Sequence, residues 1–245
     1  MIPPALSVVI PAFNEEQRLP DTLTRLVGFL ERWPGSHEIL LVDDGSTDRT
    51  VERAQEVCPS ILVTRSRRNR GKGHAVREGM RRATGRRRLM TDADLSTPIE
   101  ELERLLQQME RGYDVVIGSR ALPGAQIQVH QPIYREALGR LFNLLVRWLV
   151  VPGLHDTQCG FKLFSEEAAR VFEVTRLDGF CFDVEALFVA RKRGLRIAEL
   201  PVTWRNDAAT RVTALRGALA FADLLRIRQN ALLGRYEPGV EKDRG

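Results

Sequence analysis

Cysteine is rare in this sequence, with only Cys58, Cys159 and Cys181 among 245 residues. An odd number of cysteines without the close pairing of a zinc site argues against a disulfide framework and against a cysteine metal site. Free thiols suit a reducing cytosol. The opening MIPPALSVVIPAF also lacks the basic, apolar and small-residue order of a secretory leader. We therefore expect a cytoplasmic protein.

Long hydrophobic runs are absent as well, since none reaches the roughly 20 residues that a membrane-spanning helix needs. Two segments, about 135–151 and 213–233, are predicted to be amphipathic helices. In the first, Arg140, Asn143 and Arg147 form a narrow polar stripe on an otherwise apolar surface. Such a helix belongs either to a core or to a membrane interface. Any membrane association should therefore be peripheral.

Lysine is scarce, because only four of the 37 basic residues are lysine, and the net charge of +5 rests on arginine. A basic surface suits anionic lipid, phosphorylated substrates or nucleic acid about equally. The arginine clusters at 65–70 and 81–88 lack the interleaved aromatic residues of a single-strand binder. No helix-turn-helix, zinc-finger or RNA-recognition signature is present. We expect no nucleic-acid partner.

Short apolar runs alternate with amphipathic segments through the first half of the chain, as in LSVVIPAF, EILLVDDG, ILVTRS and RRRLMTDAD. This pattern predicts an α/β fold with a Rossmann-like, mostly parallel sheet flanked by helices. We expect a single domain over 1–236 and a disordered tail over 237–245. Each run ends in a polar motif: PAFNEE, DDGSTD, RNRGKG and DAD. Because parallel strands end at one edge of a sheet, these four motifs should meet there.

Asp92 and Asp94 follow the fourth apolar run, in the string DADLSTP. Two carboxylates in a turn favour Mg²⁺ or Mn²⁺, which share their coordination with substrate phosphates. A solvated turn is the alternative for a bare Asp-x-Asp. A calcium loop fits poorly, because Thr97 stands where that loop needs glycine.

Gly71, Lys72 and Gly73 suggest a phosphate loop. The Walker pattern fails, because it requires glycine at Ser66 and a hydroxyl residue at Gly73. The dinucleotide fingerprint fails at Val76. What remains is a lysine flanked by glycines at a helix start, which is typical of a diphosphate or nucleotide contact.

Asp43 and Asp44 end the second apolar run and precede the turn residues Gly45 and Ser46. Ser46 or Thr47 could cap the next helix. One of the two aspartates could therefore be purely structural, which leaves the other to accept hydrogen bonds from a base or a ribose.

The motifs IPAFNEE, VDDGSTD, NRGKGHAVREGM and DADLSTP, in this order and spacing, resemble those of family-2 glycosyltransferases with a GT-A fold. Downstream, GSR, DTQCGFKLF, FDVE and ELPVTW narrow the resemblance to sugar transferases that act on polyprenyl phosphates. The sequences of these motifs are most similar to those of dolichyl-phosphate β-glucosyltransferases. The resemblance covers roughly Leu6 to Trp204.

The resemblance implies a role for each motif residue. The nucleotide would be bound by Pro11, Ala12, Phe13, Asn14, Glu15, Asp43, Asp44, Gly71, Lys72, Asp92, Ala93 and Asp94, the two aspartates of DAD through the metal. The acceptor phosphate would be bound by Arg120, Arg135 and Lys162. The sugar and acceptor would face Gln158, Asp183, Glu185, Trp204 and Arg211, and the catalytic set would be Asp94, Asp183 and Arg120.

Two departures from the family pattern matter. Ser96 stands where related mannosyl enzymes often carry glutamine, which leaves the full metal shell open. After Trp204 the chain reads RNDAATRV instead of a Gly-Ser-Lys type loop, so Arg211 would have to replace that lysine.

The implied reaction is inverting transfer of a hexose, glucose from UDP-glucose, to a polyprenyl or dolichyl phosphate at a membrane surface. One alternative is transfer of mannose or another sugar from a different donor, or to a non-lipid acceptor. Another is a non-catalytic nucleotide-binding or membrane-scaffolding protein.

Overall fold

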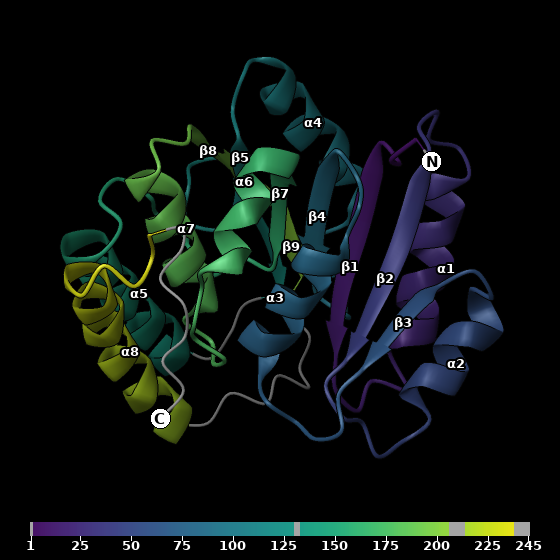
Figure 1. Ribbon diagram of the computed structural model, residues 1–245, viewed down its shortest axis with the longest axis horizontal. Helices are drawn as coiled ribbons and strands as arrows, with labels where there is room; N and C mark the ends of the chain where they lie inside the picture. Colours follow the sequence, from purple (N-terminus) through teal and green to yellow (C-terminus); the bar gives the residue numbers. More distant parts are fainter. Residues whose placement is uncertain (1, 130–132, 206–213, 238–245) are drawn as a thin grey trace.

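A seven-stranded sheet forms the centre of the computed structural model, which describes residues 2–129, 133–205 and 214–237 (Figure 1). The strand order is β3-β2-β1-β4-β7-β5-β8, and only β7 runs antiparallel to its neighbours. These strands are β1 (Leu6–Ala12), β2 (His37–Asp43), β3 (Leu62–Arg65), β4 (Arg87–Thr91), β5 (Val115–Ser119), β7 (Phe161–Ser165) and β8 (Ile197–Pro201). The predicted fold class is confirmed, and the four predicted strand runs correspond to β1 to β4.

Helices cover both faces of this sheet (Figure 1). They are α1 (Leu19–Leu30), α2 (Thr50–Val57), α3 (Lys72–Arg82), α4 (Leu102–Glu110), α5 (Ile133–Leu149), α6 (Glu166–Ala169), α7 (Phe182–Lys192) and α8 (Ala214–Leu232), with the short 3₁₀ helices η1 (Ile99–Glu101) and η2 (Arg170–Glu173). A separate pair of strands, β6 (Gln126–Val129) and β9 (Thr203–Arg205), completes the structure. The predicted helical segments 135–151 and 213–233 match α5 and α8. Residues 238–245 of the predicted tail lie outside the described part.

Alternate residues of the strands belong to two apolar cores, one on each face of the sheet. On β1, Val8 and Ile10 pack with α1, α2 and α4, whereas Val9 packs with α3, α5, α7 and α8. Because successive side chains of a strand point to opposite faces, a strand that is buried on both faces is expected to be mostly apolar, and the one polar residue of β1, Ser7, donates its hydroxyl to Glu38. All seven residues of β1 are accordingly buried.

A buried carboxylate links α7 to the segment that follows α8. Glu185 accepts hydrogen bonds from the backbone N–H groups of Arg176 and Leu177, each at 2.8 Å, and from the hydroxyl of Tyr236 at 2.7 Å. Burial raises the pKa of Glu185, and it also raises the pKa of Tyr236. The three donors satisfy a group that would be costly to bury alone. Glu185 therefore fixes the loop that leads into α7.

We expect Tyr236→Phe to lower the free energy of unfolding by about 1–3 kcal/mol, because it leaves the buried Glu185 carboxylate without one donor. Urea denaturation monitored by circular dichroism measures this. Tyr113→Phe is the matched control, because the ring contact of Tyr113 with Arg196 survives loss of its hydroxyl. Equal stability of the Tyr236→Phe protein and wild type would contradict the role of this hydrogen bond.

Candidate active site

A cavity of about 680 Å³ opens where β1, β2 and β4 end. The loop before α3, the loop before α7 and one side of α8 complete its wall. Its lining includes Pro11, Ala12, Phe13, Glu15, Asp44, Gly71, Lys72, Asp92, Ala93, Asp94, Asp178, Phe180, Asp223 and Arg226. The four strand-end motifs that the sequence predicted to meet therefore share one cavity.

The Asp92 carboxylate is held by close packing and by charge. It lies 2.5 Å from the ammonium of Lys72. On its other side is the Cα of Gly160, the residue before β7, where any Cβ would overlap the carboxylate. The backbone N–H of Asp92 donates to the carbonyl of Gly160 at 3.2 Å. Only glycine at position 160 allows Asp92 this place.

Asp94 lies two residues further along the same turn. Its carboxylate accepts a hydrogen bond from the backbone N–H of Ser96 at 2.9 Å. Burial, and after it the charge of Asp92, raises the pKa of Asp94. Leu95, between Asp94 and Ser96, has a φ of 44°, a left-handed conformation that is strained for a leucine. The turn thus holds two carboxylates together against their repulsion.

Charged groups around the turn fit a divalent cation. Four carboxylates face three cations in this part of the structure: Asp92, Asp94, Asp156 and Asp183 against Lys72, Arg120 and Lys162. No group of three or more metal-binding side chains occurs among the described residues. Two hard carboxylates suit Mg²⁺ or Mn²⁺, which fill their remaining positions with water and substrate phosphate. The donor set therefore fits such an ion.

Lys72 is the first residue of α3. Burial alone would lower the pKa of its ammonium, but the charges of Asp92 and Asp183 more than offset this, so the pKa is raised. Gly71 before it has a φ of 113°, and a Cβ there would overlap the carbonyl of Asp178. The glycines flanking Lys72 thus allow close packing against the loop before α7.

The two adjacent aspartates at the end of β2 have different roles. Asp43 is buried, accepts from the backbone N–H of Ser46 at 3.0 Å and pairs with Arg65 at 3.0 Å. Asp44 lines the cavity and accepts from the backbone N–H groups of Arg70 and Gly71, the latter at 2.7 Å. Asp43 is the structural member of the pair, and Asp44 is the one that can face a ligand.

Asn14 joins two of the loops and is not among the cavity-lining residues. Its side-chain oxygen accepts from the backbone N–H of Thr47 at 2.9 Å, and its own N–H donates to the hydroxyl of Ser46 at 2.9 Å. Its φ of 54° makes it, with Leu95, one of two non-glycine residues in the left-handed region within the described ranges.

Arg120 lies directly after β5 and is held by a carboxylate that the sequence analysis did not single out. Its Nε and Nη2 donate to Asp156 at 2.6 and 2.9 Å, and its backbone N–H donates to the same group at 3.0 Å. Burial disfavours the charged guanidinium, but Asp156 more than offsets this and raises the pKa of Arg120. The guanidinium also lies 5.3 Å from the ring centre of Trp204. In the described part of the chain, Nη1 makes no hydrogen bond.

Lys162 and Asp183 form a buried pair at 2.8 Å, with 1% of the Lys162 side chain exposed. Lys162 is a residue of β7, between β4 and β5, and also donates to the carbonyl of Cys159. Burial raises the pKa of Asp183, although Lys162 opposes the shift. Neither residue lines the cavity, but the charge of Asp183 helps to raise the pKa of Lys72, which does line it.

The remaining predicted site residues are not all brought to the active-site cavity. Gln158 is half-buried, and its backbone N–H donates to Asp156 at 3.2 Å. The Glu185 carboxylate faces the interior and is not brought to the cavity. Arg135 belongs to α5, but its side chain lies outside the described residues, and Arg211 lies wholly outside them.

Sequence reasoning missed Asp156, Asp178, Asp223 and Arg226. Asp156 opens the string DTQCG and could have been found as the acidic residue of that motif. Asp223 and Arg226, which pair at 2.9 Å, reach the cavity only because α8 packs beside the loop before α7. No local sequence pattern predicts such a contact.

Gly160→Ala should weaken Mn²⁺ binding about tenfold or more, because overpacking at this point costs about 1–3 kcal/mol and displaces Asp92. Titration with Mn²⁺ monitored by electron paramagnetic resonance measures this. Gly28→Ala is the control, since a Cβ on Gly28 meets nothing within 4 Å. Unchanged affinity in the Gly160 variant would argue against Asp92 as a ligand.

Asp156→Asn should lower the free energy of unfolding by about 3 kcal/mol, because it leaves the Arg120 charge without its buried partner. Thermal and urea unfolding measure this loss. The double variant with Arg120→Met should lose less than the sum of the two single variants. Strict additivity would show that the pair does not interact.

Comparison with known proteins identifies the family. The family model described as "Glycosyl transferase family 2" matches residues 7–172. The dolichyl-phosphate β-glucosyltransferase of Dictyostelium discoideum is 35% identical over 95% of this chain and 76% of its own length. The human protein of the same name is 36% identical over 94% of this chain and 77% of its own length.

Solved structures share the fold at lower identity. A mannosyl-3-phosphoglycerate synthase from Rubrobacter xylanophilus aligns over 98% of this chain and 78% of its own with a TM-score of 0.73 and 19% identity. A glucosyl-3-phosphoglycerate synthase from Mycobacterium tuberculosis, in complex with Mn²⁺, UDP-glucose and phosphoglyceric acid, aligns over 98% of this chain and 82% of its own with a TM-score of 0.69 and 18% identity. Because the family model matches residues 7–172 and the relatives are 35% and 36% identical over most of the chain, this chain belongs to glycosyltransferase family 2.

Proposed function

We propose that this protein transfers glucose from UDP-glucose to a polyprenyl phosphate such as dolichyl phosphate, with inversion at the anomeric carbon. The observation that carries the proposal is the shared cavity, in which Asp92 and Asp94 lie together beside Lys72. The names of the relatives at 35% and 36% identity support the acceptor and the sugar.

The donor half of the site would bind the nucleotide and its diphosphate. Asp44 and the loop that follows β1 would contact the nucleoside, as both line the active-site cavity. Asp92 and Asp94 would hold Mg²⁺ or Mn²⁺, which when bound supplies positive charge to the departing diphosphate. Lys72 would add a second charge on the same side.

The acceptor half would bind the lipid phosphate through Arg120. Asp156 already fixes its guanidinium and leaves Nη1 to donate to a phosphate oxygen. Arg135 and Arg211 remain proposed as further contacts, and Gln158 and Trp204 would border the same region. A phosphate held here would attack the anomeric carbon while the bond to UDP breaks, so positioning supplies much of the catalysis.

The reaction needs no strong base. A phosphate monoester has its second pKa at about 6 and is therefore mostly dianionic at neutral pH. Asp183, buried and paired with Lys162, would stabilise positive charge near the sugar and would not accept a proton. The proposed role of Asp183 is electrostatic.

The surface of α5 and α8 supports association with a bilayer that carries the acceptor. No described helix is both long enough and apolar enough to cross a membrane. Yet large apolar side chains are exposed on both helices: Leu144, Trp148 and Leu149 on α5, and Leu225 and Leu232 on α8, followed by Leu233. Other residues of the same helices, such as Phe142 and Leu224, are buried. The two helices therefore have a core side and an exposed apolar side, which suits peripheral binding.

The test is transfer of radiolabelled sugar to a short polyprenyl phosphate with Mn²⁺ or Mg²⁺. We expect the protein to transfer sugar from UDP-glucose and not from GDP-mannose. Asp94→Asn should lower the rate at least a hundredfold, because the metal loses one of its two carboxylates. Asp21→Asn, an exposed aspartate on α1, should behave as wild type. No transfer from any donor by the wild-type protein would overturn the proposal.

A further inference from the structure

A second hollow, of about 440 Å³, lies away from the active-site cavity, between the end of α5, α7 and α8. Most of its lining is apolar, and its remaining residues are all basic. The apolar residues are Val150, Pro152, Phe188, Ala231 and Leu232, and the basic ones are Arg191, Lys192 and Arg228. We call this hollow the lipid groove. Its volume is within the range of sites that hold small organic ligands.

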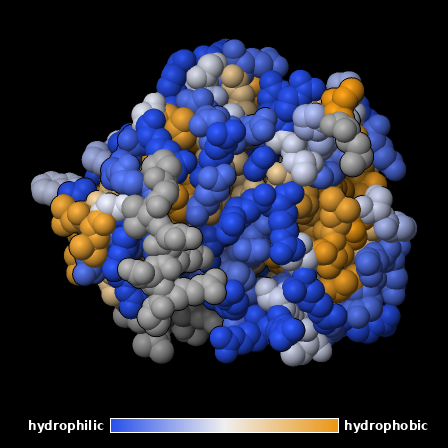
Figure 2. All heavy atoms as spheres, in the orientation of Figure 1, coloured by the Kyte–Doolittle hydropathy of each residue, from blue (hydrophilic) through white to orange (hydrophobic). Residues whose placement is uncertain are grey.

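The chain around the lipid groove exposes apolar side chains to an unusual degree. Trp148 is 82% exposed and Leu232 is 89% exposed. Leu149 and Leu233 are exposed beside them in the sequence. Figure 2 shows hydrophobic atoms gathered at the edge of the molecule where α5 and α8 lie in Figure 1. A contiguous apolar surface of this kind indicates a contact with lipid or protein.

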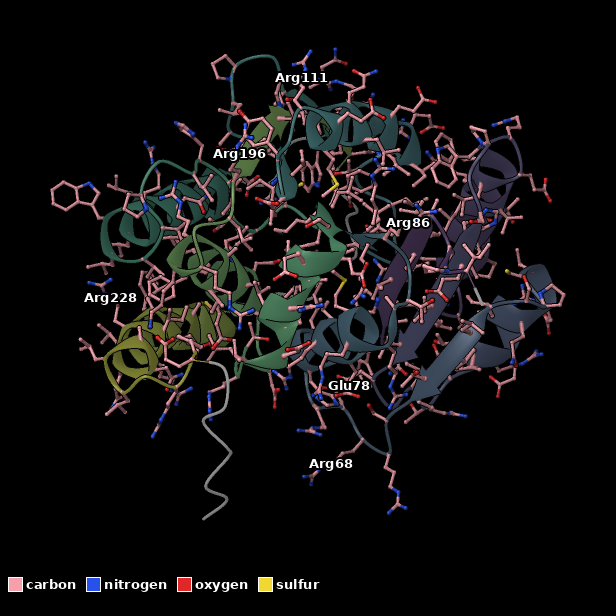
Figure 3. The ribbon with its side chains drawn as sticks, turned by 45° about the horizontal axis from the view of Figure 1, so that its top comes forward. Arg68, Glu78, Arg86, Arg111, Arg196 and Arg228 are labelled. Carbon is pink, nitrogen blue, oxygen red and sulfur yellow. The ribbon has the colours of Figure 1, made fainter. Side chains whose placement is uncertain are left out.

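Charge decides between these partners. No acidic side chain is among the described residues that line the lipid groove. Lys192 pairs with Glu237 at 2.6 Å, and Arg191 donates to the carbonyl of Pro152. Arg228 has no ion pair or hydrogen bond within the described ranges, and Figure 3 shows it on the side of the molecule formed by α5 and α8. A ligand that fits must join an apolar chain to a negative charge.

The polyprenyl tail of the acceptor matches this chemistry less well. It is neutral, so it would leave the basic residues of the lipid groove without a partner. Arg226 of the active-site cavity and Arg228 of the lipid groove are two residues apart on α8, so their side chains leave the helix on nearly opposite sides. Arg120, the proposed contact of the acceptor phosphate, does not line the lipid groove.

We propose that the lipid groove binds an anionic phospholipid of the bilayer, with an acyl chain against Phe188 and Ala231 and its phosphate beside Arg228. This rests on the proposed function, because an enzyme with a lipid acceptor must work at a membrane surface. Since α8 borders both hollows, a phospholipid bound here would hold the active-site cavity next to the bilayer.

The first test is co-sedimentation of the full chain with vesicles of phosphatidylcholine, with or without phosphatidylglycerol. Binding should require phosphatidylglycerol, and Arg228→Gln should weaken it about fivefold, the effect expected for one basic residue near an anionic surface. Arg111→Gln, which removes an equal charge at the end of α4, should leave binding unchanged (Figure 3). Equal losses in both variants would overturn the proposal in favour of overall charge.

The second test separates the lipid groove from simple adsorption. Phosphatidylglycerol with a photoreactive group on its acyl chain should label peptides that contain Phe188 or Ala231, and Leu232→Ser should reduce this labelling. Labelling confined to Trp148 and Leu149 would overturn the proposal. So would binding that responds to polyprenyl phosphate and not to phosphatidylglycerol.

Failure of the lipid groove and failure of the proposed transferase are distinguishable. Arg228 does not line the active-site cavity, so Arg228→Gln should keep wild-type turnover with a short, water-soluble polyprenyl phosphate in the absence of vesicles. Labelling of the lipid groove without sugar transfer would support the lipid groove and contradict the proposed transferase function. Sugar transfer without labelling would support the transferase function and contradict the lipid groove.

Discussion

The contact of the Asp92 carboxylate with Gly160 on one side and Lys72 on the other is the constraint on which the site depends. Three separate segments meet there: the turn after β4, the residue before β7 and the start of α3. These three segments come together only because β4 and β7 are neighbours in the sheet and α3 packs beside them. Burial and, after it, the charge of Asp92 raise the pKa of Asp94, so the fold must hold this carboxylate against desolvation as well as repulsion. Keeping two carboxylates together at this edge of the sheet therefore costs the fold some stability.

Much of this could be predicted from the sequence, because local patterns determine it. Apolar runs that end in polar motifs predicted the strands β1 to β4, and the geometry of parallel strands then predicted that Asp44, Lys72 and Asp92 would meet. The helices α5 and α8 followed from their length and amphipathic pattern. The family resemblance was confirmed by the extent of the match and by identities near 35%.

Other features depend on tertiary packing, which no local pattern encodes. Glu185 lies two residues after Asp183 in FDVE, yet its carboxylate binds backbone N–H groups and Tyr236 inside the protein. Lys162 seemed suited to an acceptor phosphate, but the antiparallel placement of β7 buries it against Asp183. Asp156 as the partner of Arg120, and α8 as a wall of the cavity, also depend on contacts between residues far apart in the chain.

The reversed direction of β7 has a consequence for how such enzymes can diversify. An antiparallel strand begins at the edge where its parallel neighbours finish, so the chain leaves the sheet at Arg120 and returns at Gly160 on one side of the molecule. The bond between Arg120 and Asp156 closes this excursion near its base. The stretch between them is therefore one excursion tied at its base, and α5 packs Phe142 and Val146 of this stretch into the core. A change on the exposed side of α5 would leave the strand ends that carry Asp44 and Asp92 in place.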